Sequence, residues 1–208
     1  MEHSFEKQSG KTKEYILECA IDLFSEKGYK EVTVREIADK VGIKASSLYK
    51  HYKSKDEILE NIFSLFRIMD QSAEYDDEML RSMESMTPES FLASSFMVFK
   101  ALVLDPRVLK ITKIINLEQT KNAMVKEFFM KEIVQKPISQ LTLTFEKMMK
   151  AGLIKPSDPE MLAKTYHSYI ISSYYLNNFI KDTIDIPEIE KDMLDYIHFF
   201  CGCVLQCP

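Results

Sequence analysis

The stretch "TVREIADKVGIKASSLYKHYKSKDEIL", residues 33–59, contains several helix starts and a tight turn within a short span. Thr33 and Glu36 have the spacing of a capping box, in which the threonine hydroxyl accepts from the glutamate amide and the glutamate reaches back. We therefore predict a short helix over 34–40. Gly42 follows it, and glycine adopts the left-handed backbone of a tight turn without steric cost.

A second short helix is predicted over 45–52, where Leu48 and Tyr52 share one face because they are four residues apart. "SKDE" (54–57) is another capping box, and it predicts a further helix from about Lys55 to Met69. Helix starts this close together indicate short helices that pack at steep angles.

A helix, a glycine-containing turn and a second helix form a helix-turn-helix, whose second helix enters the major groove of DNA. Side chains of 45–52 that can donate to phosphates or base edges are Ser46, Ser47, Tyr49, Lys50 and His51. Residues 44–55 hold four lysines and no acid, in a chain of net charge −5. A merely solvated face is the alternative, since lysine carries no sequence information by itself.

Positive charge is concentrated rather than general, because residues 1–60 hold 11 Lys and Arg against 12 Asp and Glu. We therefore expect DNA binding that depends strongly on salt.

Length and composition bound the rest of the chain. Its 208 residues are 46% hydrophobic and 28% charged, with only five glycines and seven prolines, which is typical of a globular, mostly helical protein. We predict an all-α fold of about nine helices. No apolar run approaches the roughly 18 residues of a spanning helix, and the first residues lack a signal-peptide core, so a cytoplasmic location is expected. The four cysteines are expected to be reduced thiols.

Proline and glycine mark the other helix ends. Gly28 is expected to end a helix over 12–27. Later starts are predicted at Thr87–Pro88, Asp105–Pro106, Asp158–Pro159 and Ile186–Pro187, because proline loses no hydrogen bond in the first turn. Pro137 is expected to bend or interrupt a helix that Gly152 ends. The acidic, serine-rich residues 70–89 are predicted to form the boundary between an N-terminal module and a larger C-terminal one.

Residues 33–59, with "AIDLFSEKGY" (20–29) before them, resemble the N-terminal domain of TetR-family transcriptional regulators. The matching positions are Thr33, Ile37, Ala38, Gly42, Leu48, Tyr49, Tyr52, Lys55 and Leu59. The resemblance covers about 45 residues and implies a three-helix DNA-binding domain over 1–54. Residues 55–208 would then form an effector-binding and dimerisation domain.

The resemblance also implies which residues meet DNA. Thr33 and Lys55 would bind phosphate at the starts of their helices, where anions are favoured. Lys44, Ala45, Ser46 and Ser47 would approach the bases, and Tyr49, Lys50, His51 and Tyr52 would mix groove and backbone contacts. Tyr52 has a core alternative, because it shares a face with Leu48.

Two helices over about 159–181 and 188–206 carry broad apolar stripes. By resemblance they form the four-helix interface of a homodimer, and an intramolecular core is the alternative.

The resemblance places an effector pocket among the middle helices, and methionine with aromatic linings suits an apolar or aromatic small molecule. The candidate contacts are Phe96, Met97, Phe99, Phe128, Tyr166, His167 and Tyr169. Each of them has core packing as its alternative. His167 and Asn177 either orient a ligand or are satisfied by neighbouring carbonyls.

Cofactor and enzyme interpretations find little support. In the tail "CGCVLQCP", Cys203 and Cys207 share a helix face and Cys201 does not, so small interface residues are favoured over metal or thiol sensing. "SGKT" (9–12) imitates the end of a P-loop, but Phe5 stands where its first glycine belongs. We expect that the protein binds no metal and no cofactor and that it is not an enzyme.

The resulting hypothesis is a repressor that a small-molecule effector releases from a palindromic operator. A shift at the start of the helix over 55–69 would couple the two sites. The alternative is a helical interaction protein of the same architecture, controlled by a protein partner, without ligand sensing or operator reading.

Overall fold

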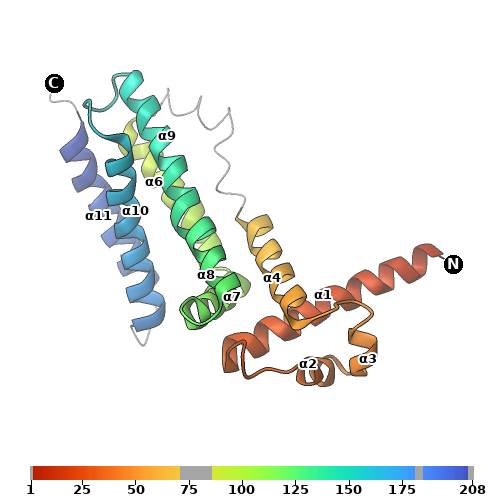
Figure 1. The fold of residues 1–208 in the computed structure, drawn as a ribbon. Coiled ribbons are helices and arrows are strands. Elements are labelled where there is room, and N and C mark those ends of the chain that lie inside the picture. The colour runs from red at the N-terminus through yellow and green to blue at the C-terminus, as the bar shows by residue number, and fades with distance from the viewer. Residues whose placement is uncertain (1, 71–85, 181–184, 206–208) are drawn as a thin grey trace. The chain divides into compact units, whose positions relative to one another are not determined.

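The structure, a computed structural model, describes residues 2–70, 86–180 and 185–205, with side chains from Thr12 onward. Throughout these ranges every regular element is a helix, which confirms the all-α fold class (Figure 1). The elements are α1 (Glu2–Lys27), α2 (Val34–Val41), α3 (Ala45–Leu48), α4 (Lys55–Met69), α6 (Pro88–Val103), α7 (Pro106–Glu118), α8 (Ala123–Phe128), the π-helix η2 (Phe129–Gln135), α9 (Lys136–Lys150), α10 (Pro159–Tyr175), the π-helix η3 (Leu176–Ile180) and α11 (Ile186–Val204). Most of the predicted boundary over 70–89 lies outside the described residues.

The chain divides into two compact units. The N-terminal unit comprises Met1–Gln71 and Leu102–Met130, and the C-terminal unit comprises Ser72–Ala101 and Lys131–Pro208. The helices α4, α7 and α8 therefore belong to the same compact unit as α1–α3. The sequence-based boundary between residues 54 and 55 instead separates a DNA-binding domain from an effector-binding and dimerisation domain. It divides the chain by function and stays a prediction.

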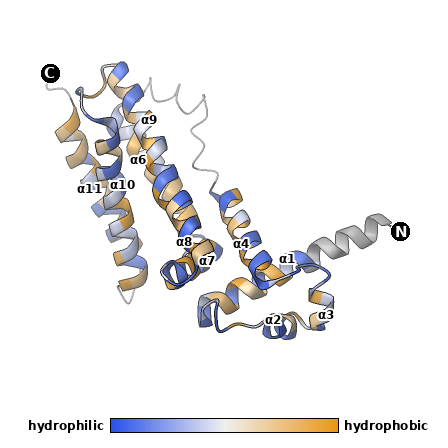
Figure 2. Ribbon diagram, viewed as in Figure 1, coloured by the Kyte–Doolittle hydropathy of each residue, from blue (hydrophilic) through white to orange (hydrophobic). Residues whose placement is uncertain are grey.

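The N-terminal unit buries one face of each of its short helices. Its fully buried side chains include Ile16, Ala20, Phe24, Ile37, Ala38, Leu48, Tyr52, Ile58, Leu59 and Ile62. Helices as short as α2 and α3 are not stable alone, so this shared core is what keeps them folded. Figure 2 shows the corresponding alternation of apolar and polar residues along α4.

The C-terminal unit is built around contacts between α9 and α10. Gly152, at φ 72°, lies in the turn after α9, which confirms that the helix ends there. The Tyr166 ring packs against Phe145 and Phe200, with centroids 6.3 and 5.2 Å away. Aromatic side chains from α9, α10 and α11 thus meet in one core.

The proline starts are confirmed. α6, α7 and α10 begin at Pro88, Pro106 and Pro159, and Pro187 is in the first turn of α11. Asp105, Asp158 and Asp185 cap three of these helices by accepting from amides of the first turn. Pro137 lies in the first turn of α9, directly after η2, so the predicted interruption is confirmed as a π-helical segment.

Candidate DNA-binding site

The capping box at the start of α2 is present in full. Thr33 Oγ1 accepts from the Glu36 amide at 3.2 Å, and Glu36 Oε2 accepts from the Thr33 amide at 2.8 Å. The Thr33 amide and then Lys27 lower the pKa of Glu36 to about 2, because both stabilise its carboxylate. The cap therefore stays ionised at any physiological pH.

The turn after α2 follows the predicted glycine geometry. Gly42 has φ 80°, and its amide and that of Ile43 donate to Asp39 and Ala38 carbonyls at 3.1 and 3.0 Å. These bonds satisfy the last carbonyls of α2. They fix the angle at which the chain enters α3.

The α-helical part of the predicted 45–52 helix is shorter than expected, since α3 ends at Leu48. The amides of Lys50 and His51 donate to Ser47 and Leu48 carbonyls at 3.2 and 2.8 Å, which are three-residue spacings. The chain thus continues as a tighter turn to His51. We call residues 44–51 the recognition segment.

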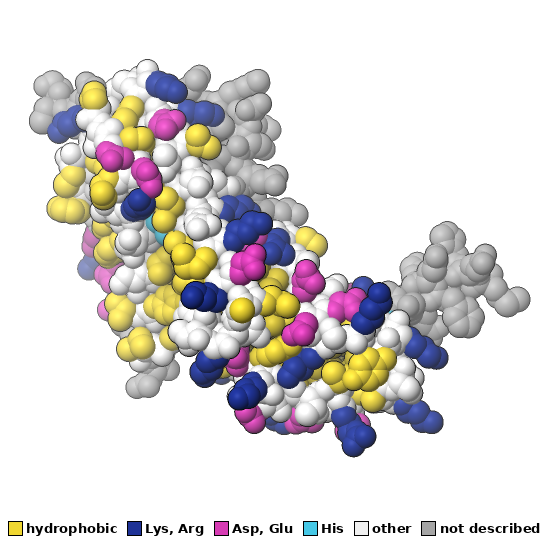
Figure 3. Space-filling view, viewed as in Figure 1, with side chains coloured by type: hydrophobic (Ala, Val, Ile, Leu, Met, Phe, Trp, Pro, Cys, Tyr) yellow, Lys and Arg dark blue, Asp and Glu magenta, His cyan; other side chains and the backbone are white. Residues whose placement is uncertain are grey.

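One face of the recognition segment points outward with its hydrogen-bonding groups unused. Lys44, Ser46, Tyr49 and Lys50 are exposed, while Ala45, Ser47 and His51 are partly exposed. Within the described part of the chain no side chain of this segment has a hydrogen bond or ion pair. Figure 3 shows basic and acidic side chains interspersed on the visible face, so net charge alone does not define the site.

Other basic side chains of the same unit are already paired. Lys27 bonds Glu36 at 3.0 Å, and Lys40 and Lys110 bond Asp22 at 3.0 and 2.6 Å. Groups engaged in this way are less available to DNA, whereas Lys44 and Lys50 are available.

Tyr52 does not share the exposed face. Its side chain is 0% exposed, and its hydroxyl donates to the Lys13 carbonyl at 3.2 Å. Burial raises its pKa, so the phenol stays neutral. This burial favours the alternative that Tyr52 packs in the core and does not contact DNA.

The two residues expected to bind phosphate differ in their surroundings. Thr33 is exposed at the start of α2. The Lys55 ammonium instead donates to the carbonyls of Tyr29 and Val32, both at 2.8 Å. Desolvation lowers the pKa of Lys55, which agrees with its partial burial.

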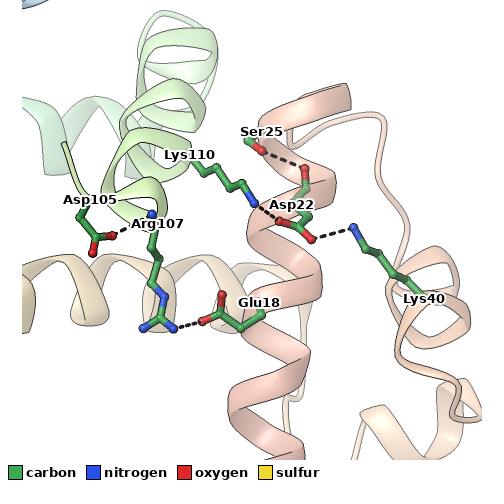
Figure 4. Close-up of polar contacts among 7 residues, drawn as sticks. All are labelled: Glu18, Asp22, Ser25, Lys40, Asp105, Arg107 and Lys110. Atoms are coloured by element: carbon green, nitrogen blue, oxygen red, sulfur yellow. Dashed lines mark hydrogen bonds and ion pairs between the residues drawn. The ribbon is translucent and has the colours of Figure 1, made fainter. Parts of the chain in front are cut away.

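Sequence reasoning missed the attachment of α7 to α1. Figure 4 shows Arg107 and Lys110 of α7 reaching Glu18 and Asp22 of α1, with ion pairs of 2.8 and 2.6 Å. Asp22 also accepts from Lys40 of α2 on its other oxygen. The Lys110–Asp22 pair joins positions 88 residues apart, which no local pattern in the sequence reveals.

A cleft of about 360 Å³ lies within the N-terminal unit. It is lined by Lys13, Glu14, Leu17, Glu18, Tyr52, Asn61, Leu65 and Arg107. The seven predicted effector contacts are not among these residues.

Six of the seven predicted effector contacts lie in the C-terminal unit, and Phe128 lies in the N-terminal unit. The Phe128 ring stacks on the Phe63 ring, with centroids 4.1 Å apart, so Phe128 packs within the N-terminal unit. Phe96 and Tyr166 belong to the C-terminal core, with Met97, Phe99 and Tyr169 packed against it. Tyr169 stacks on Tyr196 at 3.7 Å.

The two buried polar candidates are satisfied to different degrees. His167 Nε2 lies 2.8 Å from the Ile133 carbonyl oxygen, and burial lowers the pKa of the imidazole. Asn177 donates to the Ser173 carbonyl at 2.8 Å. Its Oδ1 and that of Asn178 are shielded from solvent and accept no hydrogen bond. A buried oxygen of this kind is normally paired with a hydrogen-bond donor.

The cysteines give no support to a metal site. Cys201 is buried and Cys203 exposed, and the prediction for Cys207 lies outside the described residues. Among the described His, Cys, Asp and Glu side chains, no group of three could hold a metal ion. Over the same residues, no helix has the length and apolarity needed to cross a membrane.

This geometry defines a helix-turn-helix protein, and comparison with known proteins agrees. Residues 16–62 match the family of bacterial regulatory proteins of the tetR type. The chain is 28% identical to the HTH-type regulator YhgD of Bacillus subtilis, over 73% of this chain and 76% of that one. It is 48% identical to IcaR of Staphylococcus epidermidis, a negative regulator of the biofilm operon, over 26% of this chain and 31% of IcaR.

Solved structures share the fold along nearly the whole chain. A TetR-family regulator from Mesorhizobium loti has a TM-score of 0.73 at 19% identity, covering 95% of this chain and 98% of that one. A regulator from Saccharomonospora viridis in complex with choline has a TM-score of 0.67 at 17% identity, covering 95% and 100%.

Residues 16–62 thus carry the DNA-binding domain of the tetR family, and together with the relatives along the chain this match supports a TetR-family transcriptional regulator. Regulators of this family are non-enzymatic DNA-binding proteins, so the expectation that the chain is not an enzyme is confirmed.

Proposed function

We propose that the protein is a cytoplasmic repressor that binds a palindromic operator as a homodimer and leaves it when a small molecule binds. The observation that carries this proposal is the recognition segment, whose exposed donors have no partner among the residues that the structure describes, while neighbouring cations do. IcaR is a negative regulator, which favours repression.

The proposed DNA contacts are Thr33 and the recognition segment: Lys44, Ala45, Ser46, Ser47, Tyr49, Lys50 and His51. Lys44 and Lys50 would supply charge to phosphate or guanine edges, and Ser46, Ser47 and Tyr49 hydroxyl donors. Twofold symmetry would present two such segments to successive major grooves.

The proposed dimer uses α10, η3 and α11. Large apolar side chains stand exposed along them: Met161, Leu176, Ile180, Ile186, Leu194 and Phe199. Phe199 is 66% exposed, and apolar surface gathered on neighbouring helices favours burial against a second copy.

The proposed effector site lies in the C-terminal unit, near Phe96, Met97, Phe99, Tyr166, His167 and Tyr169. The unsatisfied Oδ1 atoms of Asn177 and Asn178 favour an effector that carries an N–H or O–H donor on an apolar or aromatic body. The choline complex shows that one regulator of this fold holds a small organic molecule.

DNA binding is the first property to measure. We would titrate the wild type and Lys50→Ala against the DNA upstream of the protein's own gene and against scrambled DNA, across a salt series. We expect preference for the upstream fragment, with a salt slope that the substitution reduces by about 0.9. Equal binding to both fragments at every salt would favour the interaction-protein alternative over an autoregulating repressor.

A further inference from the structure

Lys55, at the first position of α4, is held by the loop that joins α1 to α2. Its ammonium lies 2.8 Å from the carbonyl oxygens of Tyr29 and Val32 and 3.5 Å from that of Lys30. An ammonium has three N–H donors and no acceptor, so these carbonyls occupy all of them. The ammonium also lies 4.3 Å from the centre of the Tyr29 ring, in a cation–π contact.

The carbonyls are available because the chain leaves the helix at this point. α1 ends at Lys27, and Gly28 turns the backbone with φ 85°. Residues 29–32 have no following helical turn to donate to their carbonyls. Converging carbonyl oxygens form a negative pocket, and a lysine from α4 neutralises it.

The same loop is held from a second side by α7. The Glu118 side chain is 6% exposed, and its Oε1 accepts from the Tyr29 amide at 3.1 Å. A Cβ at Gly28 would stand 3.1 Å from that oxygen, so glycine leaves room for the carboxylate. The Tyr29 hydroxyl in turn donates to Asp56 of α4. Tyr29 thus joins the loop to both α4 and α7.

This loop runs directly into Thr33, the capping residue of α2. α2 is the first helix of the helix-turn-helix, so the position of the loop sets the position of α2 and of the recognition segment behind it. A Lys55 that turned toward a phosphate would leave at least two carbonyls without their donor, in a part-buried place.

We propose that Lys55 and Glu118 are positioning residues: they clamp the loop over 28–32 from α4 and α7 and so hold the helix-turn-helix in its reading geometry. The charge of Lys55 is used within the protein and not on DNA. This inference rests on the proposed DNA-binding function and departs from the phosphate contact that the family resemblance implies.

The lysine-to-arginine exchange separates the two roles. Arginine keeps the charge and binds phosphate well, but its planar fork cannot aim three donors at converging carbonyls. We would compare Lys55→Met and Lys55→Arg with Lys50→Met, an exposed lysine of the recognition segment, on the upstream fragment across a potassium chloride series. Circular dichroism would confirm that each variant is folded at the temperature of the titration.

We expect both Lys55 variants to bind about tenfold more weakly, the loss that follows from one misplaced base contact. Amide hydrogen exchange without DNA should be faster at Tyr29 in both, and unchanged in Lys50→Met. Glu118→Gln, which keeps an acceptor for the Tyr29 amide, should bind like the wild type, whereas Glu118→Leu should resemble Lys55→Met.

Wild-type affinity in Lys55→Arg, with a salt slope reduced by about 0.9 in Lys55→Met, would assign Lys55 to phosphate and overturn the inference. Unchanged exchange at Tyr29 in the Lys55 variants would also overturn it. Faster exchange with unchanged affinity would leave only a stabilising role and refute positioning. A wild type that binds no DNA would instead end the proposed function, and the exchange data would still decide whether the clamp exists.

Discussion

Pro137 explains why a histidine is buried in the C-terminal unit. Proline has no N–H, so residue 137 cannot donate to the Ile133 carbonyl four residues earlier. His167, 8% exposed, lies with Nε2 2.8 Å from that oxygen. A neutral imidazole protonated on Nε2 can donate to this carbonyl, and burial lowers the pKa of His167, which favours the neutral form. A backbone defect and a buried polar side chain therefore satisfy each other.

The His167 interaction predicts how stability depends on pH. The folded pKa lies below the ordinary value of 6.5, so the unfolded chain binds more protons as the pH falls past that value. The contribution of His167 to stability should be full above about pH 6.5 and should be lost as the pH falls from that value toward the lowered folded pKa. Urea unfolding at several pH values measures this.

His167→Gln keeps a donor for Ile133 and cannot titrate, so its stability should vary less over this pH range. His51→Gln, in the partly exposed turn after α3, is the matched control and should keep the wild-type dependence. An unchanged pH dependence in His167→Gln would show that another group is responsible.

At the scale of elements, α7 is fastened to α1 along its length. Its first turns make the Arg107–Glu18 and Lys110–Asp22 pairs (Figure 4). Glu118, at its end, accepts from the Tyr29 amide of the α1–α2 loop. Lys40 brings α2 to the same Asp22 carboxylate, at 3.0 Å. The two lysines, Lys110 first, lower the pKa of Asp22 because both favour its ionised form. One carboxylate thus joins three helices.

Asp22→Asn should destabilise the N-terminal unit by about 1 kcal/mol, since it weakens two partly exposed pairs that are each worth a fraction of that. The loss should shrink at high salt, because salt screens partly exposed charges. Urea unfolding at low and high salt measures both effects. The stabilisation is present above the unfolded pKa of Asp22 and disappears in acid, as the pH falls through the lowered folded value.

Lys164→Met is the comparison for Asp22→Asn. It removes an exposed pair with Glu160 within α10, which bridges no other helix. We expect a smaller loss of stability than in Asp22→Asn, because water and salt screen a fully exposed pair. If the two substitutions cost the same, Asp22 has no special role as a bridge.

At the scale of the whole molecule, the exposed apolar residues of α10, η3 and α11 are the clearest sign of self-association. Phe199 is the most exposed phenylalanine among the described residues, at 66%. Phe200 beside it is buried, because successive helical residues point in different directions. α11 therefore presents one apolar face inward and leaves another uncovered.

Phe199→Asp should convert the proposed dimer to a monomer with little change in the stability of the single chain, because Phe199 is exposed within that chain. Light scattering gives the mass, and DNA titration should show weaker operator binding since two half-sites are no longer read together. Leu143→Asp, at a 58% exposed position of α9, is the control and should stay dimeric. A dimeric Phe199→Asp would place the interface elsewhere.

The sequence alone determined the local structure of this protein. Thr33 with Glu36, Gly42, Gly152 and the aspartates before Pro106 and Pro159 each carry a signal that depends only on near neighbours, so helix starts, turns and the helix-turn-helix were predictable. The short span around Gly42 was specific enough to indicate the family.

Only the tertiary structure decided which side chains of that pattern are free to act. Tyr52 and Lys55 follow the family pattern as closely as Tyr49 does, yet one is buried and the other donates to carbonyls of the α1–α2 loop. The attachment of Glu118 to Tyr29 spans 89 residues. Contacts between distant segments depend on how whole helices pack, and short-range spacing in the sequence carries no record of that packing.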